Sequence, residues 1–331
     1  MKIQPPPRFT LAQLPTPIEI LQLSPRPDWG IEIFVKRDDL TGSILSGNKV
    51  RKLEFLFYDL LSSGCDTVIT CGGIQSNHCR AVAAICATAG VKCHLVLKGD
   101  QPRKPEGNYF LSRLLGADME FVSVEEYESG IDHIMRKAAD RLRAQGKKPY
   151  IIPEGGSDPL GAWGYIKAID EIKKQVDKAG IMLDTIVTAV GSGGTYAGLY
   201  LGRKIRRWNI DILGFAVCRD SLHFQKRIFD LCIAAEDQFG TDLKLDPAEI
   251  VIDDRFIGPG YAKIGPKETA FIREIARNSG LVLDPAYTAK ALLGLFTSIA
   301  EGKFRKGAKI LFIHTGGQWG LLPQGQKIFN G

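Results

Sequence analysis

The chain contains 331 residues, 44% hydrophobic and 24% charged, which is typical of a globular enzyme and leaves room for two domains or one large α/β domain. Its net charge of +6 is spread along the chain, and without a dense Lys/Arg block it does not indicate a nucleic-acid-binding surface. The N-terminus has no apolar signal core and no run of about 18 apolar residues follows, so we expect a cytoplasmic protein with no membrane partner.

The first elements lead into a helix that begins at a lysine. Residues 1–30 are rich in proline and predict an extended lead-in, and residues 31–36 alternate like a strand. A Gly-Asn turn then delivers Lys49 to the start of an apolar run at helical spacing. Five side chains of this run are expected to face a core: Val50, Leu53, Phe57, Leu60 and Leu61.

Lys49 is a candidate nucleophile because the helix behind it is anchored. A lysine that is held still and partly desolvated has a lowered pKa, and its free amine can attack a carbonyl group. The ordinary alternative is a solvated lysine at a helix start.

After this helix, strands and helices alternate to the end of the chain. Strands are predicted at residues 67–71, 93–97, 119–123, 150–153, 185–190, 212–217, 249–253 and 309–314. Helices are predicted between them, including one that ends at residue 89 and others at 160–179 and 196–205. The alternation predicts an α/β fold with two mostly parallel sheets flanked by helices and a cleft between them.

The seven cysteines do not form a recognisable pattern. Their odd number and the lack of Cys-x-x-Cys pairs argue against a disulfide framework and against a metal site, so most are expected to be reduced core thiols. A reactive thiol is the alternative for Cys71 or Cys79, which flank a loop with functional features.

Three polar, glycine-containing stretches follow predicted strands, where ligands bind in open parallel sheets. Gly191-Ser192-Gly193-Gly194-Thr195 precedes a helix, so its amides and hydroxyls predict a phosphate site, with a tight structural turn as the alternative. It is neither a Rossmann fingerprint nor a Walker loop. Residues 72–78 could receive a carboxylate, although Ser76 or Asn77 could equally be a helix N-cap. Thr315, before two glycines, suits the edge of a flat ligand, and His314 is expected to be structural.

A reactive lysine, a phosphate site, a carboxylate-binding loop and a hydroxyl at a ring edge together indicate pyridoxal 5'-phosphate. The lysine would form a Schiff base with its aldehyde, and the pyridine ring would act as an electron sink.

At this point the motifs resemble a known family. SGNKVRKLEF, GGIQSNHCRA, GSGGTYAGL, LDPAYT and ILFIHTGG, in this order, are similar to the D-cysteine desulfhydrase/1-aminocyclopropane-1-carboxylate deaminase family over residues 10–320. The resemblance implies the two-domain, tryptophan synthase β-like fold (fold type II). We expect a larger cofactor-binding domain from residues 1–51 and 163–331, a smaller inserted domain from 52–162, and an active site between them.

The resemblance also implies roles for individual residues. Lys49 would be the Schiff-base lysine, Asn77 would bond the cofactor's ring oxygen, and Thr315 would contact the pyridine nitrogen. Lys52 would help the loop Gly191, Ser192, Gly193, Gly194 and Thr195 to hold the phosphate. Ser76 would face the substrate carboxylate together with Gln75, Asn77 and His78. Tyr287 would face the ring and the substrate, and Tyr261 would join it.

Two positions depart from ring-opening deaminases, which carry Glu after the Asp-Pro-x-Tyr tyrosine and Gln after the Ser-Asn pair. Here these residues are Thr288 and His78. An acid beside the pyridine nitrogen would keep it protonated, whereas a hydroxyl of Thr288 or Thr315 does not. Since β-elimination of a good leaving group needs a weaker electron sink than ring opening, the departures favour a desulfhydrase-like lyase.

The sequence therefore predicts α,β-elimination on a small amino acid, with D-cysteine as the first choice of substrate. Lys49 would remove the α-proton, with Ser76 or Tyr287 as the less favoured base. The alternatives are 1-aminocyclopropane-1-carboxylate deaminase, L-cysteate sulfo-lyase and a catalytically silent amino-acid-binding homologue. Relatives are commonly homodimers, so a homodimer is expected, although no stretch of sequence identifies its interface.

Overall fold

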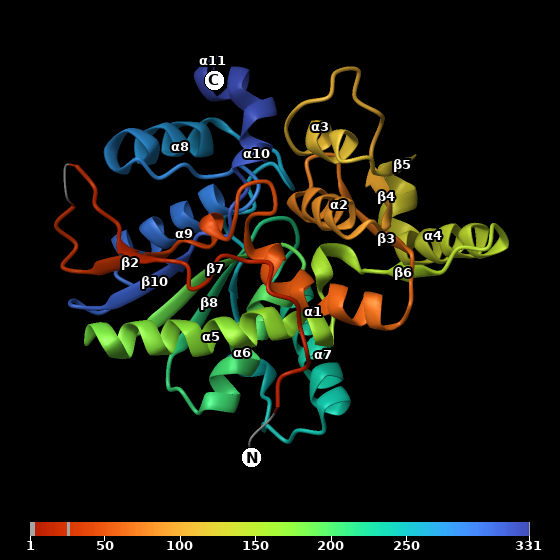
Figure 1. Cartoon of the computed structure of the whole chain (residues 1–331). Helices are drawn as coiled ribbons and strands as arrows, with labels where there is room; N and C mark the ends of the chain where they lie inside the picture. Colours follow the sequence, from red (N-terminus) through yellow and green to blue (C-terminus); the bar gives the residue numbers. More distant parts are fainter. Residues whose placement is uncertain (1–3, 25–26, 331) are drawn as a thin grey trace.

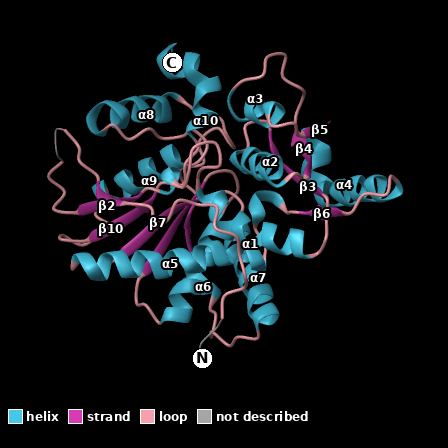
Figure 2. Ribbon diagram, viewed as in Figure 1, coloured by secondary structure: helices cyan, strands magenta, loops and turns pink. Residues whose placement is uncertain are grey.

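Two mostly parallel β-sheets, each flanked by helices, make up the computed structural model, which describes residues 4–24 and 27–330 (Figures 1 and 2). The predicted fold class is thereby confirmed. Within the described residues, none of the helices combines the length and the apolar character needed to cross a membrane.

The larger sheet has six strands. Their order is β1 (Ile18–Ile20), β2 (Glu32–Lys36), β10 (Lys309–Ile313), β7 (Thr185–Val190), β8 (Asp211–Ala216) and β9 (Val251–Asp253). Only the β1–β2 pair is antiparallel among these described neighbours. Every residue of β7 is buried, as expected for a central parallel strand that is covered on both faces.

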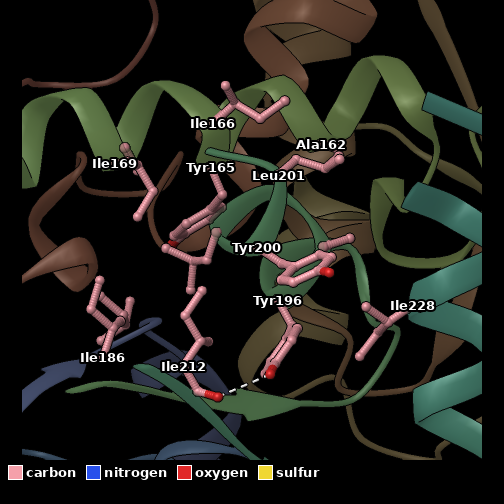
Figure 3. Packing of buried hydrophobic residues seen from close by; sticks show 14 of the residues in the cluster. Ala162, Tyr165, Ile166, Ile169, Ile186, Tyr196, Tyr200, Leu201, Ile212 and Ile228 are labelled. Carbon is pink, nitrogen blue, oxygen red and sulfur yellow. Dashed lines mark hydrogen bonds between the residues drawn. The ribbon is translucent and has the colours of Figure 1, made fainter. Parts of the chain in front are cut away.

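Helices cover both faces of this sheet (Figure 1). On one face lie α5 (Pro159–Ala179), α6 (Gly194–Arg206) and α7 (Ser221–Phe239), and on the other α8 (Pro266–Ser279) and α9 (Thr288–Ala300). Figure 3 shows the hydrophobic packing on the face covered by α5, α6 and α7, where Tyr196 of α6 donates a hydrogen bond to the Ile212 carbonyl at 2.9 Å. Gly198 allows α6 to approach α5 closely, because a Cβ there would lie 2.4 Å from the Ala162 carbonyl oxygen. The chain ends in α10 (Gln318–Leu321) and α11 (Gly325–Asn330).

The smaller sheet has four parallel strands. Their order is β5 (Asp118–Val122), β4 (Lys92–Lys98), β3 (Thr67–Gly73) and β6 (Pro149–Ile151). Its helices are α2 (Asn77–Ala89), α3 (Gly107–Leu114) and α4 (Val124–Ala144). The domain limits at residues 52 and 162 stay a prediction.

Helix α1 (Asn48–Ser62) packs on both groups of elements. Leu53, Phe57 and Leu60 belong to the core of the smaller sheet, whereas Phe55 packs into that of the larger sheet. The prediction that Leu61 faces a core is wrong, since it is 38% exposed. Leu61 lies at the end of α1, where residues 61–64 are all exposed, whereas Leu60 still reaches the core.

Strand boundaries differ from the prediction at β9. Residues 249–253 were expected to be a strand, but Pro247–Glu249 form a 3₁₀ turn that is capped by the Asp246 side chain. The strand therefore begins at Val251.

Candidate active site

Lys49 lies in the first turn of α1, just after a turn at Gly47 that contacts the residues following β10. Gly47 has a left-handed φ of 91°, and a Cβ there would lie 2.8 Å from the Thr315 carbonyl oxygen, so only glycine fits this approach. The Asn48 amide donates to the same oxygen at 3.1 Å. The first turn of α1 is thus fixed relative to the carboxyl end of the larger sheet.

The Lys49 amine is buried between the two groups of strands. Its side chain approaches the Gly155 carbonyl oxygen, with Nζ at 3.4 Å. Burial lowers its pKa to about 8, and the nearby Glu154 and Cys79 side chains offset part of this effect. A substantial fraction of the amine is therefore unprotonated just above neutral pH.

Lys52, one turn later on α1, is the second buried amine. Its Nζ donates to the Gly155 carbonyl at 3.1 Å and to Ser157 Oγ at 3.4 Å. Burial and then the charge of Lys49 hold its pKa well below the ordinary value. Neither lysine has an ion-pair partner among the described residues. Because a buried cation without an anion is costly, this pair is ready to receive an anionic group.

The loop after β7 faces these lysines. Residues 191–193 lead into α6, and Gly193 adopts a left-handed φ of 87°. Ser157 Oγ donates to Ser192 Oγ at 2.8 Å and accepts from the Gly194 amide at 3.2 Å. A helix N-terminus, two hydroxyls and the Lys52 ammonium, which would lie 2.7 Å from a Cβ on Gly194, converge here. This is the chemistry that a phosphate group requires.

A narrow cavity runs from this loop to Thr315. Its lining includes Lys49, Asn77 and Tyr287. Gly191 lets the Tyr287 ring approach, since a Cβ there would lie 2.8 Å from Tyr287 Cε1. The Asn77 amide is held by Asn108, whose Nδ2 donates to its Oδ1 at 2.8 Å. An anion site, a buried amine and a polar edge in one cavity fit pyridoxal phosphate.

A second cavity of about 420 Å³ adjoins the first. It shares Lys49 and Tyr287 with the first cavity and adds Ser76 and Tyr261 to the lining. Ser76 is the N-cap of α2, with its Oγ accepting from the Cys79 amide at 3.2 Å. The α2 N-terminus therefore presents its amides to this space, as a substrate carboxylate requires.

The two tyrosines form a pair. Their hydroxyl oxygens are 2.6 Å apart, and their rings are nearly perpendicular. Burial raises the pKa of Tyr261, and burial together with the neighbouring Tyr261 raises the pKa of Tyr287 well above its ordinary value. Both hydroxyls therefore stay protonated near neutral pH, which favours Lys49 over Tyr287 as the base.

His78 lines the second cavity and Gln75 lines neither, and both side chains contact other protein groups. Both ends of the Gln75 amide are engaged by α3, through the Glu106 carbonyl at 3.1 Å and the Asn108 amide at 2.9 Å. His78 Nε2 lies 2.9 Å from Thr70 Oγ1, whose proton goes to the Ile152 carbonyl. His78 is therefore a donor to Thr70, and burial and the two lysines lower its pKa well below the ordinary value. Its substrate-binding role stays a prediction.

Thr288 and His314 are structural. Thr288 Oγ1 donates to Asp284 Oδ1 at 2.7 Å at the start of α9, and Thr288 does not line the first cavity. His314 Nδ1 accepts from the Gly316 amide at 3.2 Å, and its Nε2 lies 3.0 Å from the Val282 carbonyl. Of the two candidate hydroxyls, only Thr315 lines the cavity.

The structure contradicts the suggestion of a reactive cysteine. All seven cysteines are free, and both Cys71 and Cys79 are buried. Burial raises the pKa of Cys79 to about 12 and that of Cys71 well above its ordinary value. The nucleophilic thiolate is therefore disfavoured at both positions.

Sequence reasoning missed several residues of this site. Asn48 Nδ2 donates to Thr195 Oγ1 at 3.0 Å, and Glu154, Gly155 and Ser157 lie at the end of β6. The sequence contains a signal for the last three residues, because Glu154-Gly155-Gly156-Ser157 follows a predicted strand, as the other three glycine-containing loops do. The prediction extended that strand to residue 153 and did not consider the turn after it.

Comparisons with known proteins agree with this geometry. The family described as "Pyridoxal-phosphate dependent enzyme" matches residues 9–316. The chain is 42% identical to the bifunctional D-cysteine desulfhydrase/1-aminocyclopropane-1-carboxylate deaminase of Arabidopsis thaliana, covering 96% of this chain and 79% of the relative. It is 38% identical to a D-cysteine desulfhydrase of Klebsiella pneumoniae, covering 94% of each. A crystal structure described as an ACC deaminase homologue superposes with a TM-score of 0.89 at 36% identity, covering 98% of this chain and 96% of that one.

Proposed function

The chain belongs to the pyridoxal-phosphate dependent enzymes of fold type II, and from this membership we propose that it catalyses α,β-elimination on a small amino acid, with D-cysteine as substrate. The products would be pyruvate, hydrogen sulfide and ammonia, with one water consumed. The observation that carries the proposal is the buried Lys49 amine, which lies between an anion-binding loop and a second, substrate-sized cavity.

Bound pyridoxal phosphate would supply the electron sink for this chemistry. Lys52 and the loop Gly191–Thr195 would hold its phosphate, and Asn77 and Thr315 would contact its ring. The same two buried lysines, Lys49 and Lys52, place a reactive amine and a phosphate ligand on one helical face.

The remaining residues would orient the substrate and move its proton. The α2 N-terminus at Ser76 would bind the substrate carboxylate, which places the α-carbon near Lys49. The unprotonated Lys49 amine would take the α-proton, because its lowered pKa leaves it available near neutral pH. The protonated hydroxyls of Tyr261 and Tyr287 would donate hydrogen bonds in the same cavity.

Desulfhydrase activity is favoured over ring opening by the lining of the cofactor cavity. Among the described residues, no Asp or Glu lines it, and Thr315 would be the neutral group at the ring edge. Without an acid to protonate it, the pyridine nitrogen gives a weaker electron sink. Ring opening remains the second candidate because the Arabidopsis relative is described as having both activities.

The test is product analysis with purified protein in its yellow, cofactor-loaded form. D-cysteine should yield sulfide and pyruvate in equal amounts, whereas 1-aminocyclopropane-1-carboxylate should yield little 2-oxobutanoate. Lys49→Ala should lose the yellow absorbance and lower the elimination rate by about 10³-fold or more. Loaded protein that releases no sulfide from D-cysteine would exclude this substrate, and a persisting absorbance in Lys49→Ala would exclude this lysine.

We also propose a cytoplasmic homodimer with domains at residues 1–51 plus 163–331 and 52–162. The domain limits and the homodimer follow from the family resemblance. Light scattering of the purified protein would test the dimer, and limited proteolysis near residues 52 and 162 would test the domain limits.

A further inference from the structure

Glu154 is a carboxylate in the active site for which the mechanism above has no use. It is the first residue of the 3₁₀ turn Glu154–Gly156, which follows β6 at the carboxyl end of the smaller sheet. Its half-buried side chain lines the 420 Å³ cavity together with Lys49, Ser76 and the two tyrosines. Charged side chains are seldom buried without a partner, and those in an active-site cavity often have a function.

Tyr127 fixes the orientation of this carboxylate. The buried Tyr127 hydroxyl, on α4, donates to Glu154 Oε1 at 2.7 Å. No protein donor to Oε2 is found within the described residues. The carboxylate is thus held at one oxygen, and the other is available to a ligand.

Glu154 and Lys49 both line the 420 Å³ cavity. The Glu154 charge raises the pKa of Lys49, yet the two groups form no ion pair in the described part of the chain. A substrate whose carboxylate binds at Ser76 and whose α-carbon is near Lys49 has only its β-substituent left to enter this space. Glu154 would therefore meet the β-substituent.

Several cations and a second carboxylate, Glu128, line the same cavity. Lys98 and Arg219 both pair with Glu128, at 3.7 and 3.4 Å. Arg227 Nε donates to the Ser192 carbonyl at 3.1 Å, on the phosphate side. His223 has a pKa lowered by burial and by Arg227, so it is mostly neutral. Glu154, unlike Glu128, has no ion-pair partner among the described residues, so it is the carboxylate of this cavity whose charge would act on the β-substituent.

We propose that Glu154 is a specificity-determining residue that selects small amino acids with a neutral or positively charged β-substituent and rejects those with an anionic one. The inference rests on the proposed elimination and narrows its substrate class. In each case Lys49 takes the α-proton, the Cβ–substituent bond breaks with its electron pair leaving on the substituent, and water releases pyruvate and ammonia. A thiol, chloride or ammonium would be accepted, and a sulfonate or carboxylate would be excluded by repulsion.

The experiment compares substrates that differ in β-charge, each as D and L forms. They are β-chloroalanine (neutral), cysteate (anionic) and 2,3-diaminopropionate (cationic), with pyruvate as the common product. Glu154→Gln keeps the shape and the Tyr127 contact but removes the charge. It should raise the ratio of kcat/KM for cysteate to that for β-chloroalanine by about tenfold or more, as expected for removing a like charge a few ångströms away. It should lower the ratio of kcat/KM for 2,3-diaminopropionate to that for β-chloroalanine by a similar factor.

Two variants serve as controls. Glu125→Gln removes the same charge from an exposed site on α4 and should leave both ratios unchanged. Tyr127→Phe should move them in the same direction as Glu154→Gln but less, because the carboxylate remains and only its orientation is lost. Unchanged ratios in Glu154→Gln would overturn the inference.

Ligand binding separates this inference from the proposed function. Absorbance titration of the loaded protein with alanine and aspartate, which lack a leaving group, measures the β-charge preference without turnover. Glu154→Gln should narrow the preference for alanine over aspartate by about tenfold. If no substrate gave pyruvate but this preference still depended on Glu154, the elimination would be rejected and the charge selection retained. If the wild type and Glu154→Gln showed the same preference for alanine over aspartate, the proposed role of Glu154 in charge selection would be rejected.

Discussion

Lys49 illustrates how burial determines the chemistry of one side chain. Lysine in water is almost fully protonated at neutral pH, and the ammonium form is not a nucleophile. Lys49 is 9% exposed as a residue and has no ion-pair partner among the described residues, so burial of its amine lowers the pKa to about 8. The Glu154 and Cys79 side chains act in the opposite sense and keep the pKa from falling further.

This shift predicts how cofactor loading depends on pH. Only the unprotonated amine attacks the aldehyde, so the rate at which apoprotein regains its yellow absorbance with added pyridoxal phosphate should rise with pH, with a midpoint near 8. Glu154→Gln should move the midpoint lower, because the carboxylate that raises the Lys49 pKa is removed. A midpoint near 10, as for an ordinary exposed lysine, would contradict the assigned burial.

At the scale of elements, α1 and the loop before α8 position the reactive groups through buried charges. Arg51 of α1 donates to Asp38 at 2.7 and 2.8 Å and to Glu171 of α5 at 2.9 Å. These contacts fix the helix that carries Lys49 against the larger sheet. Lys290 of α9 donates to the carbonyls of Ile257 and Gly260, at 2.7 and 2.6 Å, and so holds the loop that carries Tyr261.

Arg51→Met should destabilise the protein strongly. It leaves the buried Asp38 carboxylate without its cation, which costs about 3–5 kcal/mol in comparable cases. Arg219→Ala is the matched control, because its pair with Glu128 is at the surface and should contribute less than about 1 kcal/mol. Urea unfolding of both variants measures the free energy of unfolding that each loses. Equal losses would show that the buried Arg51 contacts stabilise the protein no more than a surface ion pair does.

Lys290→Met should impair substrate use through Tyr261. Buried carbonyls without a donor cost about 1–3 kcal/mol, and the loop should relax to avoid this cost. We expect kcat/KM for D-cysteine to fall about tenfold. Adding Lys290→Met to Tyr261→Phe should then cost little more, because both changes act on one hydroxyl. Fully additive losses would show that Lys290 acts independently of Tyr261.

At the scale of the whole molecule, the site draws on both sheets. The loop Gly191–Thr195 and Thr315 follow strands of the larger sheet, Ser76 and Glu154 follow strands of the smaller one, and α1 runs between them (Figure 1). A ligand bound there contacts both groups at once.

Cofactor binding should therefore stabilise the entire fold. A ligand that binds only the folded state adds about 2.7 kcal/mol at a free concentration near 100 times Kd. Pyridoxal phosphate should raise the Tm of the wild-type apoprotein, and Lys52→Ala should reduce that rise, because the phosphate loses a buried cation. An equal rise in both proteins would argue against Lys52 as a phosphate ligand.

The sequence determined the alternation of strands and helices, the lysine at a helix start and the glycine loops after strands. These features are local, because hydrophobic period, turn residues and cap residues act over a few positions. From them, the fold class, the cofactor and most of the candidate residues could be predicted.

Only the tertiary structure decided which of these residues meet. In the fold, Thr288 bonds to Asp284, and Gln75 bonds to residues at the start of α3. Burial raises the pKa of Cys79 and so disfavours a reactive thiolate there. Ser157 lies within hydrogen-bond distance of Lys52, and Glu154 lines the same cavity as Lys49. Burial, charge pairing and the filling of a cavity depend on contacts between segments more than 100 residues apart, such as Lys49 and Gly155. Such contacts leave no periodic trace in the chain, so the pKa of Lys49 and the charge beside the substrate follow only from the packed fold.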